Sequence, residues 1–156
     1  MKKAAIFLCI AWALLAQLLP AAAETEHPLA AAAQNALAQE NHVSVLETET
    51  EIQLYFTLRQ DPHGRTPMTL YLFTRDVFAM CAEIAELLPE GCKTVYFQAN
   101  ADFSDGDSAA GPEPAMSATL SANSVRRVAD MPREVRLAFS LKDVTKDYWI
   151  HDAFLD

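Results

Sequence analysis

Between residues 52 and 101 the spacing of the apolar residues changes from every second residue to a helical repeat and back again. Residues 52–58 and 93–103 alternate as half-buried strands do, whereas residues 75–88 place their apolar side chains on one helical face. The alternating apolar residues of the first segment are Ile52, Leu54, Phe56 and Leu58. We therefore predict an α+β fold with a mainly antiparallel sheet of about four to five strands and one amphipathic helix packed on one face.

Further segments complete this predicted sheet. Residues 59–67 contain two prolines and a glycine, which indicates a hairpin loop that returns into a strand over 68–73, MTLYLF. The same alternation predicts strands over 116–122 and 134–141. A short helix is expected after Thr145, and it would bury three apolar side chains. These side chains are Trp149, Ile150 and Phe154.

The chain divides into three parts. Residues 1–23 have a basic start, an apolar stretch and a run of small residues, which is typical of a secretory signal peptide cleaved after Ala23. The alternative is a retained membrane anchor, since this stretch is about 20 residues long. Residues 24–42 are expected to be an alanine-rich N-terminal lead-in, either a docked helix or a frayed segment, and residues 43–156 a single α+β domain. We expect the protein to be exported to the bacterial periplasm and to have no membrane contact after cleavage of the signal peptide.

Cys81 and Cys92 are the two cysteines outside the expected signal peptide. Exported proteins meet an oxidising environment, and the turn between the predicted helix and the next strand lets the two residues approach each other. We predict a structural disulfide between them. Free buried thiols are the main alternative, because a redox pair favours the CxxC spacing and a zinc site needs four ligands.

The chain carries 21 acidic and 12 basic residues, a net charge of −9. This balance argues against nucleic acid as a partner, because nucleic-acid binding depends on basic patches. Glu47, Glu49 and Glu51 are spaced two apart, which in one extended segment places them on one face. That face could bind a basic protein of the cell envelope, or it could simply protect an edge strand from aggregation.

Motifs for enzymatic chemistry are missing from the sequence. It contains no GxSxG, HExxH or glycine-rich phosphate motif, so we expect no catalytic, cofactor or metal residues. Asp102, Asp105 and Asp107 could gather around Ca²⁺, but they do not follow the EF-hand pattern, and a solvated turn is the preferred interpretation. Residues 104–115, which include two of these aspartates, are expected to form a loop.

Three hypotheses for function follow. The first is an exported, non-enzymatic protein that acts by binding, as an acidic inhibitor or immunity-type partner of a cationic protein. The second is a small-molecule or solute-binding accessory domain, with a pocket between the helix and the sheet near Trp149. The third is a hydrolase whose active site is not recognisable from the sequence. The oligomeric state is left open by all three.

Overall fold

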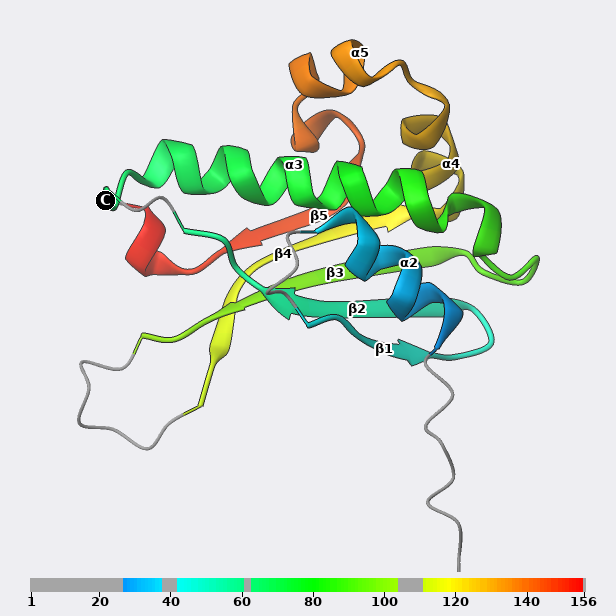
Figure 1. Cartoon of the computed structure of the whole chain (residues 1–156), viewed down its shortest axis with the longest axis horizontal. Helices are drawn as coiled ribbons and strands as arrows, with labels where there is room; N and C mark the ends of the chain where they lie inside the picture. The colour runs from blue at the N-terminus through cyan, green and yellow to red at the C-terminus, as the bar shows by residue number, and fades with distance from the viewer. Residues whose placement is uncertain (1–26, 38–41, 61–62, 104–110, 156) are drawn as a thin grey trace, which may run out of the picture.

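The structure is a computed structural model that describes residues 27–37, 42–60, 63–103 and 111–155. Five strands form one sheet in the order β1-β2-β3-β4-β5, so that spatial order follows chain order (Figure 1). The strands are β1 (Ser44–Glu47), β2 (Glu51–Thr57), β3 (Thr94–Ala101), β4 (Glu113–Ser121) and β5 (Thr145–Ile150). The α-helices are α2 (Pro28–Ala36), α3 (Thr66–Ile84), α4 (Ala122–Asp130) and α5 (Arg133–Ala138). Short 3₁₀ helices are η1 (Ala85–Leu87), η2 (Leu141–Asp143) and η3 (Asp152–Phe154).

The sheet is mixed. β2 and β3 are parallel, while the other three pairings are antiparallel. Parallel neighbours need a crossover connection, and α3 supplies it between β2 and β3. The predicted α+β fold, with a sheet and a helix packed on it, is therefore confirmed.

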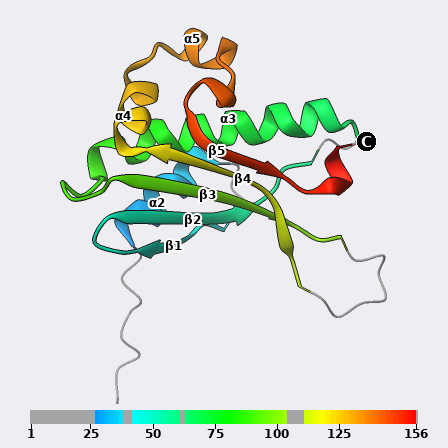
Figure 2. The same ribbon diagram turned by 180° about the vertical axis from the view of Figure 1, so that it is seen from behind.

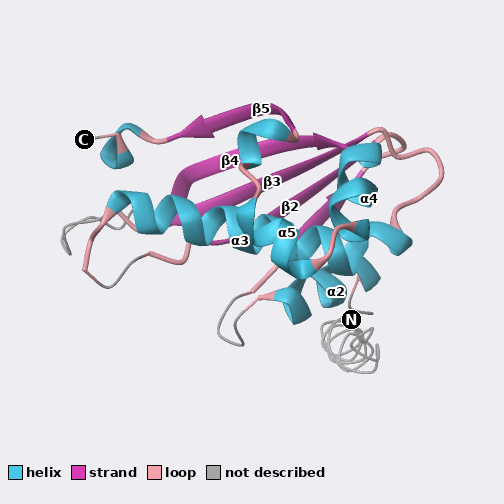
Figure 3. Cartoon of the chain, turned by 90° about the horizontal axis from the view of Figure 1, so that it is seen from above, coloured by secondary structure: helices cyan, strands magenta, loops and turns pink. Residues whose placement is uncertain are grey.

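The core lies between the sheet and the layer that contains α2, α3 and α4. Figure 3 shows the long helices on one side of the sheet, and Figure 2 shows the strands in front of them when the molecule is turned. The alternating residues of β2 and β3 are in register, with Ile52 opposite Val95 and Leu54 opposite Phe97. All four of these side chains are buried beneath α3.

Residues 68–73 belong to α3, and the strand predicted for them is wrong. Pro67 lies in the first turn of α3, where its fixed φ and missing N–H favour the start of a helix. Thr69, Phe73, Val77 and Met80 are buried at helical spacing, so the apolar face predicted over 75–88 extends one and a half turns further back. The hairpin predicted around 59–67 is accordingly a strand-to-helix connection.

The predictions for the C-terminal part are wrong in both segments. Residues 133–138 form α5 instead of a strand, since the chain there is rich in Glu, Arg, Leu and Ala, which favour helices. Residues 145–150 form β5 instead of a helix, because β4 offers a free edge with which they pair. Trp149, expected in the core, is 45% exposed in this edge strand.

The N-terminal part contains α2, whose Leu29 and Ala33 are buried against the core. Residues 1–23 lie outside the described residues, so the signal peptide and export to the periplasm stay predictions. Of the loop expected over 104–115, residues 104–110 also lie outside them, and the last three belong to β4. Among the helices that the structure describes, none combines the length and the apolar character needed to cross a membrane.

Candidate functional site

A cavity of about 560 Å³ lies between α3 and the α5 region. Its lining comes from the outer face of α3, the end of α2, α5 with the segment that follows it, and β5. Figure 1 shows α5 standing above α3, on the side away from the sheet. The volume is in the usual range for small-molecule sites, roughly 300 to 1,000 Å³.

Basic side chains are concentrated in this cavity. Arg75 comes from α3, Arg133 and Arg136 from α5, and Lys142 from η2, while Glu83 is the one acidic residue among the lining side chains. The chain as a whole has the opposite balance, with 21 acidic and 12 basic residues. The cavity is thus a locally cationic site in an acidic protein, which favours an anionic ligand.

Arg136 has an unsatisfied polar atom at this site. Its Nε is buried and has no hydrogen-bond partner among the described residues, although buried polar atoms usually have one. The four basic residues of the cavity also form no salt bridge within the part of the chain that the structure describes. The guanidinium of Arg75 lies 5.8 Å from the centre of the Tyr71 ring, which holds it on the cavity side of α3. These cations therefore have hydrogen-bonding capacity for a ligand.

Apolar side chains complete the lining. Phe78 is buried in the cavity wall, while Leu137 and Phe139 line it and stay 43% and 37% exposed. The Tyr148 side chain also lines it, and burial raises the pKa of this phenol, so the hydroxyl stays neutral and able to donate at pH 7. Cations and apolar groups in one cavity suit a ligand that is both charged and apolar.

The position of the cavity differs from that expected for a solute-binding site. A pocket between the helix and the sheet near Trp149 was predicted, but the cavity lies on the outer side of α3. Tyr148 reaches it, whereas the neighbouring residue Trp149 is on the opposite side of β5, because side chains alternate along a strand.

Both cysteines are buried thiols in this structure. Cys81 is fully buried in α3 and Cys92 precedes β3. Burial raises the pKa of both thiols, in Cys81 against the opposing effect of the nearby Arg136 guanidinium. The Cys92 thiol donates a hydrogen bond to the Thr94 carbonyl, 3.5 Å away. A disulfide between them stays a prediction; buried neutral thiols of this kind are poor nucleophiles.

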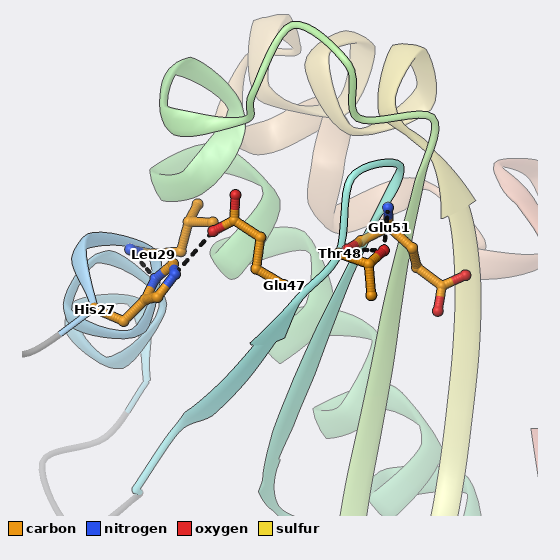
Figure 4. Close-up of polar contacts among 5 residues, drawn as sticks. All are labelled: His27, Leu29, Glu47, Thr48 and Glu51. Atoms are coloured by element: carbon orange, nitrogen blue, oxygen red, sulfur yellow. Dashed lines mark hydrogen bonds and ion pairs between the residues drawn. The ribbon is translucent and has the colours of Figure 1, made fainter.

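The three glutamates predicted to bind a basic partner are not on one face of one strand. β1 ends at Glu47, Glu49 lies in the turn, and β2 begins at Glu51. The Glu47 carboxylate is 2.9 Å from Nε2 of His27, whereas Glu51 accepts a hydrogen bond from the Gln53 amide. Figure 4 shows Glu47 directed toward His27 and Glu51 pointing away from it. The turn separates the carboxylates, and their role in partner binding stays a prediction.

Metal binding finds no support in the described ranges. No group of three His, Cys, Asp or Glu side chains that could hold a metal ion occurs there. Asp105 and Asp107 of the considered calcium cluster lie outside these ranges.

Comparisons with protein-family models, with curated proteins and with solved structures give no match for this chain. The functional interpretation of the cavity therefore depends on its geometry alone. Sequence reasoning did not identify its residues, because they come from segments between Asn35 and Tyr148 that only folding brings together. One signal was available: four arginines stand between residues 126 and 136 of an otherwise acidic chain, and two of them line the cavity.

Proposed function

We propose that this protein acts by binding a small amphipathic anion in the cavity between α3 and α5. The observation that carries the proposal is the set of four basic side chains with no salt bridge among the described residues, facing a cavity whose other walls are largely apolar. The ligand class is a carboxylate, sulfate or phosphate joined to an apolar body. This corresponds to the second of the three sequence-based hypotheses, with the site moved to the outer side of α3.

Charge selects the ligand class. Arginine side chains stay charged in proteins and match the planar geometry of carboxylate and phosphate groups with two parallel hydrogen bonds. A cationic ligand would meet one carboxylate, Glu83, against four positive charges. Inorganic anions would fill little of a cavity of about 560 Å³ and would leave Phe78, Leu137 and Phe139 in contact with water.

Calorimetric titration with three ten-carbon probes tests the proposal. Decanoate carries the anionic head, decanol is neutral and decyltrimethylammonium is cationic. We expect saturable binding of decanoate and at least tenfold weaker binding of the other two, since a charge-assisted hydrogen bond contributes about 1.5 to 3 kcal/mol. Equal binding of all three probes would show that apolar contact alone drives association and would contradict the proposal.

A matched pair of substitutions locates the site. Arg136→Gln removes a cavity cation whose Nε is unsatisfied, and should weaken decanoate binding about tenfold. Arg127→Gln removes the same charge from an exposed position on α4, outside the cavity lining, and should leave the affinity within about twofold. Loss of affinity in both variants would assign the effect to net charge and not to the cavity.

Binding of a basic envelope protein through Glu47, Glu49 and Glu51 is the other sequence-based hypothesis, and it stays a prediction. Affinity capture at low and high salt tests it, because a contact between exposed charges weakens as the screening length falls from about 10 Å at 0.1 M to about 3 Å at 1 M salt. The hydrolase hypothesis likewise stays a prediction, and we assign no catalytic residue to it.

A further inference from the structure

The sheet has a second face, opposite the helices, and within the described residues no helix covers it (Figures 2 and 3). The pairing registers align its side chains in rows across the strands. One row runs Ser44, Tyr55, Gln98, Ser117 and Trp149 across all five strands. The next row runs Leu46, Gln53, Tyr96, Thr119 and Asp147. We call these two rows the open face.

Hydrogen bonds along the strands hold the amides of the open face in position. In β2 the Tyr55 hydroxyl donates to Gln53 Oε1 at 2.5 Å. In β3 the Tyr96 hydroxyl donates to Gln98 Oε1 at 3.0 Å, and Gln98 Nε2 donates to Asn100 Oδ1 at 2.8 Å. Each amide keeps a further donor hydrogen, because its NH₂ group has two. The polar groups of the face are therefore preorganised for a second set of hydrogen bonds.

Three aromatic side chains stand among these amides. Tyr55 and Tyr96 are half-buried and meet edge to face, with ring centres 6.5 Å apart. Trp149 is 45% exposed in β5, three strands from Tyr55 in the same row. With neighbouring strands about 4.8 Å apart, Tyr55 and Trp149 are separated by roughly 14 Å. This distance is the length of a short oligomer and exceeds that of a single sugar ring.

The charge of the open face differs from that of the molecule. Its two rows contain one carboxylate, Asp147 at the edge strand, and no lysine or arginine, although the chain has a net charge of −9. The Glu51 carboxylate adjoins the second row, where it accepts a hydrogen bond from Gln53, so carboxylates border the face in β2 and β5 while an anionic partner would meet no lysine or arginine. A purely apolar partner would desolvate the Gln53, Gln98 and Thr119 side chains without replacing their hydrogen bonds to water. Complementarity therefore favours a neutral partner rich in hydroxyl groups.

We propose that the open face is a binding surface for a neutral oligosaccharide. The apolar faces of pyranose rings would stack on Tyr55 and Trp149, as amphipathic aromatic rings favour, and their hydroxyl groups would bond the amides of Gln53 and Gln98. This surface is independent of the anion cavity, because β2, β3 and β4 separate it from the helix layer.

Titration calorimetry with cellohexaose, maltohexaose and glucose tests this proposal. We expect at least one hexasaccharide to bind at millimolar Kd or better, with glucose at least tenfold weaker because it reaches only one aromatic ring. Trp149→Ala and Tyr55→Ala should each weaken binding of that hexasaccharide five- to tenfold. Phe139→Ala removes an exposed aromatic ring from the anion cavity and should leave this affinity within twofold. Circular dichroism confirms that each variant is folded.

Other outcomes overturn the proposal. Absence of hexasaccharide binding by the folded wild-type protein contradicts it directly, as does binding that neither Trp149→Ala nor Tyr55→Ala weakens. Sedimentation analysis addresses the competing occupant: a dimer of the wild-type chain that Trp149→Ala dissociates would show that a second copy covers the face. Arg136→Gln should not change hexasaccharide binding, so failure of the anion proposal and failure of this one are distinguishable.

Discussion

At the scale of single residues, the ion pair of Arg59 and Asp76 connects the end of β2 to α3. Arg59 Nη2 lies 2.5 Å from Asp76 Oδ1, and the Asp76 side chain is almost fully buried. Burial raises the pKa of this carboxyl to about 6, and it outweighs the attraction of Arg59 and Arg75, which lowers the pKa. Asp76 is therefore an aspartate that takes up a proton at mildly acidic pH.

This raised pKa predicts an unusual pH dependence. Because the folded state holds the Asp76 proton more tightly than the unfolded chain, where the pKa is about 3.9, this group lowers the free energy of unfolding as the pH rises from about 4 to about 6. A shift of this size corresponds to roughly 3 kcal/mol. The side chain in Asp76→Asn cannot titrate. The free energy of unfolding of wild type minus that of the variant should therefore fall by roughly this amount as the pH rises from about 4 to about 6.

Urea unfolding at pH 4, 5, 6 and 7 measures this difference for wild type and Asp76→Asn. The comparison removes the contribution of the other carboxylates, which both proteins share. A difference that stays constant, or that grows with pH, would show that Arg59 dominates and that the Asp76 carboxylate is charged throughout.

At the scale of elements, α3 distinguishes the folded arrangement from the one predicted by alternation. In a strand over 68–73, Tyr71 and Phe73 would lie on the same face, because their positions differ by two. In α3 they point in nearly opposite directions. Phe73 is fully buried and stacks on Phe56 with ring centres 6.1 Å apart, whereas Tyr71 is 42% exposed.

The helix therefore predicts different costs for two neighbouring truncations. Phe73→Ala should lower the free energy of unfolding by about 3 to 5 kcal/mol, since it removes a fully buried ring from the core. Tyr71→Ala should lower it by less than about 1 kcal/mol, since the ring is on the surface. Thermal or urea unfolding of the two variants measures both values. Similar costs would indicate one shared face and contradict the helical assignment.

Sequence patterns predicted the elements whose residues alternate against one core. Ile52, Leu54, Val95 and Phe97 define β2 and β3 because every second side chain is buried beneath α3. Short apolar runs failed, since six residues of MTLYLF satisfy a strand or a helix equally and only packing decides. Residues 145–150 form a strand because β4 has a free edge, and that neighbour is not visible in the local sequence.

The anion cavity was beyond prediction for a related reason. Val135, Leu137 and Phe139 alternate, which suggested a strand with one buried face, but all three are exposed side chains on or after α5. Leu137 and Phe139 line the cavity, whereas Val135 is exposed outside its lining. The alternation therefore did not mark one buried face of a strand.

At the scale of the whole molecule, charge is segregated. The acidic residues give the chain its net charge of −9, while Arg75, Arg133, Arg136 and Lys142 are gathered around one cavity. An acidic surface repels large polyanions, whereas a small anion can enter the cationic cavity. Size and charge together would therefore favour the small anion that we propose as ligand over a large polyanion.

Stability should be segregated in the same way. β2, β3 and β4 pair on both sides and bury the side chains of one face beneath the helices, whereas α5 contains no buried residue. Local opening is easiest where few apolar contacts hold a segment, so hydrogen exchange should be fast over 133–142 and slow in the central strands. Because part of the cavity wall belongs to this segment, a ligand that bridges α3 and α5 should stabilise the closed arrangement.

Hydrogen exchange with mass spectrometry measures this coupling. Decanoate at 100 times its Kd should slow exchange over 133–142 by up to about 100-fold, since binding to the closed state lowers the population of the open state by the same factor. The central strands, whose exchange requires global unfolding, should slow by the same factor, because the unfolded chain does not bind decanoate. Arg136→Gln should reduce the effect at the same decanoate concentration. Slow exchange over 133–142 without ligand would show that α5 is firmly packed. An exchange rate that decanoate does not change would show that α5 takes no part in the anion site.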